Sequence, residues 1–211
     1  MRHRGVVLIS AIWAVLSTAS WAGPREDGDA AWRANDYAKA VKFYRQAAEQ
    51  GDPGGMTSLA RQYQLGSGTE KNPGEAAKWN KRAAEIYRQR AAQGDAEAQY
   101  ALAVLYDGNA LGMPNDPAEH LKWISAAAEQ DHVIAQTRLG LLYSQGLGVP
   151  EDRVKAYTWW LIASGPHARP LSDRDKRFAD LAAANARDMA NALSPAQIAQ
   201  AKSAATVWKP K

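Results

Sequence analysis

The chain has 211 residues, with 26 lysines and arginines against 22 aspartates and glutamates, and it contains no cysteine. A chain of this length can bury a sizeable core unaided. The absence of cysteine excludes disulfides and a cysteine-linked lipid anchor, and the near balance of charge gives no case for nucleic acid as a partner.

Residues 1–22 have the three parts of an export signal: a basic start at Arg2 and Arg4, an apolar run over 6–16, and small residues before a cleavage point. The apolar run has 11 residues, whereas a helix that crosses a bilayer needs about 20. We predict cleavage after Ala22 and a periplasmic or secreted product without a membrane span. A buried core helix or an uncleaved anchor is the alternative.

The segment 23–53 is predicted to form a cap or half-repeat. It contains a short helix followed by a second helix over 37–50, which Asp36 is placed to cap.

A spacing pattern then recurs three times: a tyrosine, a glycine-containing turn, an Asn or Asp, and a tryptophan. It covers 63–79, 106–123 and 143–159, so that Tyr and Trp are 16, 17 and 16 positions apart. Self-similarity with a period in the thirties or forties is typical of a helical solenoid. We place three repeats within 54–165, over 54–95, 96–131 and 132–165.

Helix starts recur at matching positions of the repeats. The predicted caps are Asp36, Asn72, Asp116 and Asp152. They are separated by 36, 44 and 36 residues, so one repeat carries an insertion of about eight residues, which is predicted to lengthen its second helix by about two turns. Glu75 and Glu119, three residues after their caps, are expected to complete capping boxes.

Glycine and other small residues are predicted to shape the hairpins. Gly66 and Gly146 can adopt the left-handed conformation that ends a helix, and Gly140 can let two helices approach closely. Seven aromatic rings are expected to carry most of the burial, those at positions 43, 63, 79, 106, 123, 143 and 159. On this alignment, replacing Trp159 by alanine is expected to cost about 3–5 kcal/mol.

The segment 166–211 is predicted to close the open end of the stack. A breaker-rich connection precedes a long helix over about 172–192, and Ser194 with Gln197 forms a capping box for a last helix. Ile198 and Trp208 share the apolar stripe of that helix.

The sequence AQTRLGLLYSQGLGVPEDRVKAYTWWLIAS at 135–164 resembles a Sel-one-like repeat, a longer-turned relative of the tetratricopeptide repeat. The resemblance extends over about 36–164. It implies an all-α, right-handed superhelical solenoid of antiparallel helix pairs. It also implies an adaptor that assembles other proteins, often at or outside the bacterial inner membrane.

Two features depart from that family. His120 occupies the position of Ala76 and Ala156 in the sister repeats, and its turn has one extra residue. One branch of the family resembles cysteine-rich secreted proteins with penicillin-binding or β-lactamase activity. The absence of cysteine here argues against that activity.

We find no catalytic, cofactor-binding or metal-binding constellation in the sequence. His120, His132 and His167 are not paired at the i, i+4 spacing of a helix-borne metal site. His120 is interpreted as a packed or surface histidine, with a pH-sensitive switch as the alternative. Asp173 and Asp175 are interpreted as complementing a helix dipole.

If first helices line the concave side, as the resemblance implies, nine residues form a groove for another protein or peptide. They are Thr57, Arg61, Gln64, Tyr100, Val104, Asp107, Thr137, Leu141 and Ser144. The sequence therefore predicts an exported, non-enzymatic scaffold or regulator that needs no cofactor. The alternative is a protein that binds cell-wall glycan or peptide, or a weak cell-wall hydrolase.

Overall fold

The computed structural model describes residues 23–167 and 169–211, so the predicted export signal lies outside the described residues. Within these ranges the regular structure consists of ten α-helices and no strand. The helices are α1 (Pro24–Arg33), α2 (Tyr37–Glu49), α3 (Pro53–Leu65), α4 (Pro73–Ala92), α5 (Ala96–Leu105), α6 (Pro117–Glu129), α7 (Val133–Gln145), α8 (Arg153–Ala163), α9 (Asp173–Ala190) and α10 (Pro195–Val207). The predicted all-α class is confirmed.

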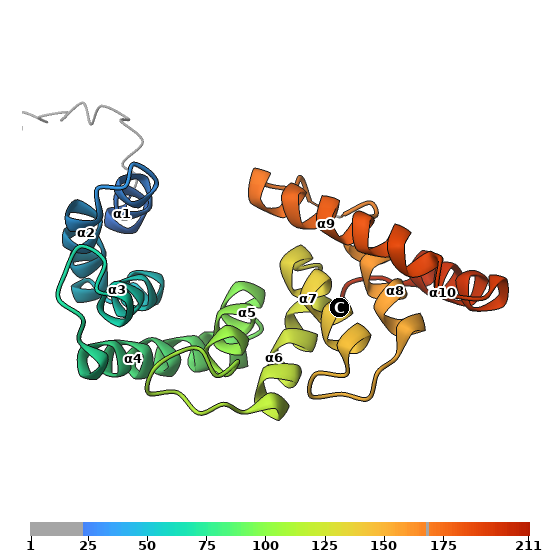
Figure 1. The fold of residues 1–211 in the computed structure, drawn as a ribbon, viewed down its shortest axis with the longest axis horizontal. Coiled ribbons are helices and arrows are strands. Elements are labelled where there is room, and N and C mark those ends of the chain that lie inside the picture. The colour runs from blue at the N-terminus through green and yellow to red at the C-terminus, as the bar shows by residue number, and fades with distance from the viewer. Residues whose placement is uncertain (1–22, 168) are drawn as a thin grey trace, which may run out of the picture.

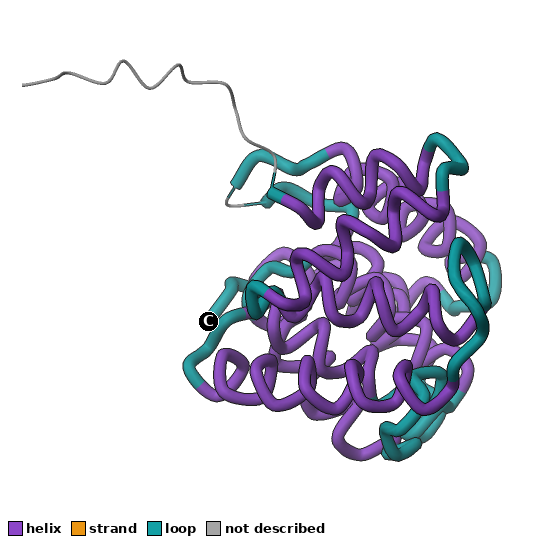
Figure 2. The backbone as a smooth tube through the Cα atoms, turned by 90° about the vertical axis from the view of Figure 1, so that its left-hand side faces the viewer, coloured by secondary structure: helices purple, strands orange, loops and turns teal. Residues whose placement is uncertain are grey.

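The helices form an arc of hairpins, in which each helix from α1 to α8 contacts the next one in the sequence. Figure 1 shows α1, α3, α5 and α7 on the inner side of the arc and α2, α4, α6 and α8 on the outer side. Figure 2 shows the same helices stacked side by side. Neighbouring hairpins bury one another's apolar faces, as in a solenoid.

Four side chains begin the outer helices as the sequence predicts. Asp36, Asn72 and Asp152 accept hydrogen bonds from the third backbone N–H of their helices, at 3.1, 3.0 and 2.9 Å. Asp116 caps α6 in the same way, at 3.1 Å. Each cap satisfies a backbone donor that the helix itself leaves unpaired.

The expected capping boxes at Glu75 and Glu119 do not form. The Glu119 carboxylate instead accepts from Trp123 Nε1 at 2.7 Å and Lys122 Nζ at 2.8 Å. Glu75 pairs with Lys78. Each glutamate carboxylate therefore pairs with side chains three or four residues further along its own helix, and not with the backbone N–H of the N-cap residue. The box of Ser194 and Gln197 is confirmed.

The glycine turns follow the prediction in two of the three predicted repeats. Gly66 (φ 73°) and Gly146 (φ 66°) end α3 and α7 in the left-handed conformation. In the repeat between them, α5 has 10 residues where α3 and α7 have 13, and the connection over 106–116 is correspondingly longer. The predicted insertion also appears, because α4 has 20 residues and α2 and α6 have 13.

The core is a row of local clusters, and its packing corrects the alignment at α8. Trp160 is the buried tryptophan, 4% exposed, and its Nε1 donates to the carbonyl of Thr137 at 3.1 Å. Trp159 is half-buried and meets Trp208 edge to face at 6.3 Å. Trp160 of α8 therefore packs against α7. The sequence alignment had assigned this core position to Trp159, one residue earlier.

The last two helices both pack on α8, and α9 also contacts α7. Figure 1 shows α9 crossing above α7 with its first turn directed toward the interior of the arc. Trp208 lies beyond α10 in extended conformation and not on the helical stripe expected for it. The backbone N–H of Lys211 donates to the carbonyl of Glu129 at 2.9 Å, which ties the end of the chain to α6.

Candidate functional site

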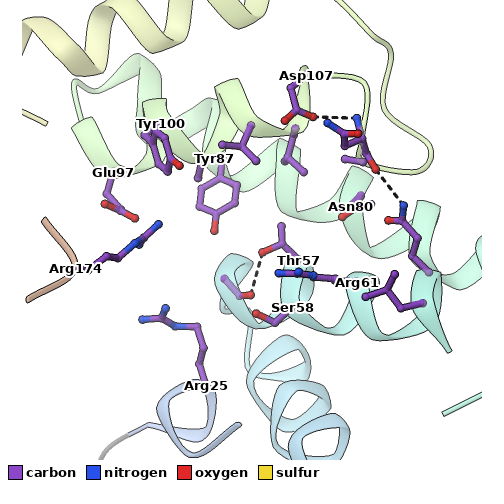
Figure 3. A pocket seen from close by; sticks show the side chains of 18 residues that line it. Arg25, Thr57, Ser58, Arg61, Asn80, Tyr87, Glu97, Tyr100, Asp107 and Arg174 are labelled. Carbon is purple, nitrogen blue, oxygen red and sulfur yellow. Dashed lines mark hydrogen bonds between the residues drawn. The ribbon is translucent and has the colours of Figure 1, made fainter. Parts of the chain in front are cut away.

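The inner side of the arc contains an open hollow of about 620 Å3 (Figure 3). Its walls come from α1, α3, α4, α5, the connection over 106–116 and the first turn of α9. Segments from the first and the ninth helix therefore meet at one site. Such a wide opening suits an extended chain better than an enclosed small molecule.

Six of the nine residues predicted for the groove line this hollow. They are Thr57, Arg61, Gln64, Tyr100, Val104 and Asp107. Those of α3 and α5 recur at intervals of three or four positions, which places them on the inner face of each helix. Their location agrees with the predicted groove, and their role in binding stays a prediction.

The other three predicted residues lie elsewhere. Thr137 is 4% exposed, because α9 covers it: its hydroxyl donates to the carbonyl of Val133 at 2.9 Å and also lies 3.3 Å from the carbonyl of Phe178 on α9. The sequence could not indicate this cover, since α9 is not part of a repeat. Ser144 is half-buried, donates to the carbonyl of Leu141 at 2.9 Å and does not line the hollow.

Leu141 lines a second, smaller hollow of about 340 Å3 beside the first. Leu141 and Leu147 are 41% and 50% exposed there, and Arg138 lies at the same hollow. Asp107 lines both hollows. The two spaces therefore adjoin at the end of α5, the larger with three arginines and the smaller with two exposed leucines.

Twelve of the 18 residues that line the large hollow were not predicted from the sequence, and four of these are ionisable: Arg25, Tyr87, Glu97 and Arg174. Arg25 and Arg174 belong to the first and ninth helices, outside the three predicted repeats. Tyr87 lies in the inserted part of α4, where the sister repeats offer no equivalent position. Only Glu97 carried a usable signal, because it precedes Tyr100 by three positions on the same helix.

Glu97 and Tyr100 line one wall of the hollow, and His132 contacts both of them. The His132 ring stacks on the Tyr100 ring at 4.7 Å between centroids. His132 Nδ1 accepts from the backbone N–H of Ala135 at 3.2 Å, so the ring proton is on Nε2, which donates to the Glu97 carboxylate at 2.9 Å. This hydrogen bond outweighs burial and lowers the pKa of Glu97. Glu97 is therefore an ionised acceptor at neutral pH.

The connection over 106–116 forms another wall by packing back onto the preceding hairpin. Gln64 Nε2 donates to the carbonyl of Asn109 at 3.2 Å, and Asn80 Nδ2 donates to the carbonyl of Leu111 at 3.0 Å. A β-carbon on Gly112, whose φ is 79°, would lie 2.5 Å from that of Ala77. Gln64, a predicted groove residue, therefore also supports the wall.

His120 is packed inside the structure. It is 9% exposed, and its Nδ1 lies 2.8 Å from the carbonyl of Ala103.

Among residues 23–167 and 169–211, no group of three or more His, Asp or Glu side chains is arranged to hold a metal ion. No helix in these ranges has the length and apolar character that a membrane span requires.

A family model described as the Sel1 repeat matches residues 26–52, 53–86, 96–132 and 133–164. The chain belongs to the Sel1 repeat family. The first matched Sel1 repeat comprises α1 and α2, the segment for which a cap or half-repeat was expected. Sel1 repeats generally mediate protein–protein interactions. The first helices of the first three matched repeats, α1, α3 and α5, line the large hollow, whereas α7 of the fourth lines the smaller one.

Three similar proteins give this Sel1 repeat chain its context. Chitin synthase regulatory factor 3 of Schizosaccharomyces pombe is 30% identical over 128 residues, which are 60% of this chain and 13% of that protein. A protective antigen of uropathogenic Escherichia coli with an SLR fold is 25% identical with a TM-score of 0.50, over 86% of this chain and 45% of that one. A Sel1 repeat protein from Oxalobacter formigenes is 26% identical with a TM-score of 0.45, over 77% of this chain and 73% of that one. The chain thus spans less than half the length of the first two.

Proposed function

We propose that this protein is exported and acts in the bacterial envelope as a scaffold or regulator that binds another protein and catalyses no reaction. The observation that carries the proposal is the open hollow on the inner side of the arc, to which consecutive repeats contribute side chains. Polar groups and the exposed side chains of Leu65, Leu141 and Leu147 line this hollow and the smaller one beside it, which suits an extended peptide or a partner helix.

Export is supported by the sequence of residues 1–22, with its basic start, short apolar run and small residues before Gly23. Cell fractionation and N-terminal sequencing of the purified protein test this part. We expect a periplasmic or secreted protein that begins at Gly23. Recovery of the full-length chain from the cytosol would contradict it.

A hydrolase that cleaves cell-wall glycan would ordinarily need two cooperating carboxyl groups about 5–9.5 Å apart. The carboxylates that line the hollow, Glu97 and Asp107, are ten positions apart along and just beyond α5, which corresponds to about 15 Å of helix rise. No observation therefore favours this alternative over protein binding.

Site-specific photo-crosslinking in cells tests the binding role. A photoreactive residue at Val104 lies in the hollow, and one at Lys42 lies exposed on α2, on the outer side of the arc. We expect a discrete crosslinked partner from position 104 and none from position 42. Equal crosslinking from both positions, or from neither, would contradict the proposal.

A further inference from the structure

Three arginines from three separate parts of the chain share the large hollow. Arg25 comes from α1, Arg61 from α3 and Arg174 from the first turn of α9. Figure 3 shows their side chains directed into the same space, with the Tyr87 hydroxyl facing it from the opposite wall. Like charges repel one another, so this grouping gains from an anion between them.

Two of these guanidinium groups have no carboxylate partner within the described residues. Arg25 pairs with Glu26 at 2.7 Å and with Asp52 at 3.2 Å. By contrast, no ion pair within 4.0 Å involves Arg61 or Arg174 in the part of the chain that the structure describes. Arg61 lies 6.0 Å from the ring of Trp32. Both arginines therefore keep their fork of N–H donors available.

The neighbouring carboxylate does not occupy Arg174. Glu97 lines the same hollow, but His132 Nε2 donates to it at 2.9 Å. Arg174 is near enough for its charge to help lower the pKa of Glu97, after the larger effect of the His132 hydrogen bond. His132 thus holds Glu97 at one wall, and Arg174 is left for a ligand.

Neutral donors complete the site. Burial, with a contribution from the charge of Asp52, raises the pKa of Tyr87 to about 12. Its hydroxyl therefore keeps its proton at neutral pH and can donate to an anion. The hydroxyl of Ser58 on α3 lines the same space.

The charge balance of the lining favours a singly charged anion. Its ionised side chains are three arginines and two carboxylates, Glu97 and Asp107, which leaves at most one net positive charge, because Arg25 also pairs with Glu26 and Asp52 outside the lining. A carboxylate matches this balance and accepts two parallel hydrogen bonds from a guanidinium. A phosphate dianion would meet the negative charge of Glu97 and Asp107.

We propose that Arg61 and Arg174 anchor a carboxylate of the partner polypeptide in this hollow, with the Tyr87 hydroxyl as a further donor. The inference rests on the proposed function, because it specifies which chemistry the groove selects. It also makes α9, the helix that follows the repeats and carries Arg174, part of the binding site. The carboxylate comes either from an Asp or Glu side chain or from a chain terminus.

Retention of defined peptide pools on the immobilised protein tests the proposal. Three pools consist of heptapeptides with an acetylated N-terminus and an amidated C-terminus, with Glu, Gln or Lys fixed at the centre and uncharged residues elsewhere. A fourth pool has Gln at the centre and a free C-terminal carboxylate. We expect the Glu pool or the free-carboxylate pool to be retained about tenfold above the amidated Gln pool, and the Lys pool least. Comparison of the two carboxylate pools identifies the source.

Matched variants assign the effect to the two arginines. Arg61→Gln and Arg174→Gln are each expected to lower retention of the preferred pool about tenfold. Arg177→Gln, on the same helix as Arg174 but outside the hollow, is expected to leave it unchanged. Circular dichroism confirms that each variant is folded. Arg25 is left intact, because it pairs with Asp52, the cap of α3.

Three results would overturn the inference. Equal retention of the Glu, free-carboxylate and Gln pools would show peptide binding without carboxylate selection, so the proposed function would stand alone. Inorganic phosphate that displaces the preferred pool at lower concentration than acetate would assign the arginines to phosphate. No retention of any pool, together with no crosslinking from position 104, would overturn both proposals.

Discussion

Gly140 on α7 lies directly against the indole ring of Trp160 on α8. A β-carbon at position 140 would lie 2.5 Å from Trp160 Nε1 and 2.6 Å from Cδ1. The same indole donates its N–H to the carbonyl of Thr137, one turn earlier on α7. The hairpin therefore combines a close backbone contact with a hydrogen bond, and both depend on the absence of a side chain at position 140.

Gly140→Ala is expected to destabilise the protein. Overpacking costs about 1–3 kcal/mol, and the better helix propensity of alanine offsets at most about 1 kcal/mol. Urea unfolding measures the difference. Gly74→Ala on α4 is the control, because the nearest atom to its new β-carbon is Asn72 Oδ1 at 3.4 Å, and it should be neutral or stabilising. Equal stability of the Gly140 variant and wild type would contradict the packing.

The two adjacent tryptophans of α8 should differ in their contribution to stability. Trp160→Ala is expected to lower the free energy of unfolding by about 3–5 kcal/mol, because it leaves a cavity against α7. Trp159→Ala removes a half-buried ring that contacts Trp208 and should cost clearly less. Thermal and urea unfolding of the two variants decide the order. A larger loss at position 159 would restore the alignment derived from the sequence.

Asn80 is expected to hold the connection over 106–116 in place. It is 4% exposed, and Asn80→Ala leaves the carbonyl of Leu111 without the donor that it has in the native structure, at a cost of about 1–3 kcal/mol. Hydrogen exchange should become faster within 106–116 while α9 keeps its protection. Lys81→Ala, at an exposed neighbouring position on α4, provides the control. Unchanged exchange in the Asn80 variant would show that other contacts suffice.

Asp175 is expected to make the folded state sensitive to acid. Burial raises the pKa of its carboxyl group, but hydrogen bonds from Ser172 and Arg169 outweigh this effect and hold the pKa below its usual range. The resulting stability is present above the unfolded pKa of about 3.9 and is lost as the pH falls through the folded pKa.

Asp175→Asn should therefore be less stable than wild type at neutral pH, and this difference should shrink as the solution becomes more acidic than about pH 4. Urea unfolding across the acidic range measures it. Asp173→Asn, in the same turn with a side chain that is 96% exposed, should follow the wild-type profile. A difference between Asp175→Asn and wild type that does not change with pH would contradict this account.

The sequence by itself determined the features that depend on local backbone chemistry. Asp36, Asn72, Asp116 and Asp152 cap helices because their side chains reach backbone donors only two or three residues away. Gly66 and Gly146 end helices because the left-handed conformation suits a residue without a side chain. Repetition of these short-range signals was sufficient to predict an all-α solenoid, whereas the inner face of α3 and α5 was predicted from the resemblance to the Sel-one-like repeat.

Tertiary structure decided which of the predicted surfaces remains open. Thr137 has the same repeat position as groove residues, yet it is covered by α9, a helix that no repeat pattern describes. Arg25 and Arg174 meet at one hollow only because the arc curves enough to bring α1 and α9 to the same space. Curvature accumulates from small rotations between successive hairpins, and spacing along the chain carries no information about how far that rotation proceeds.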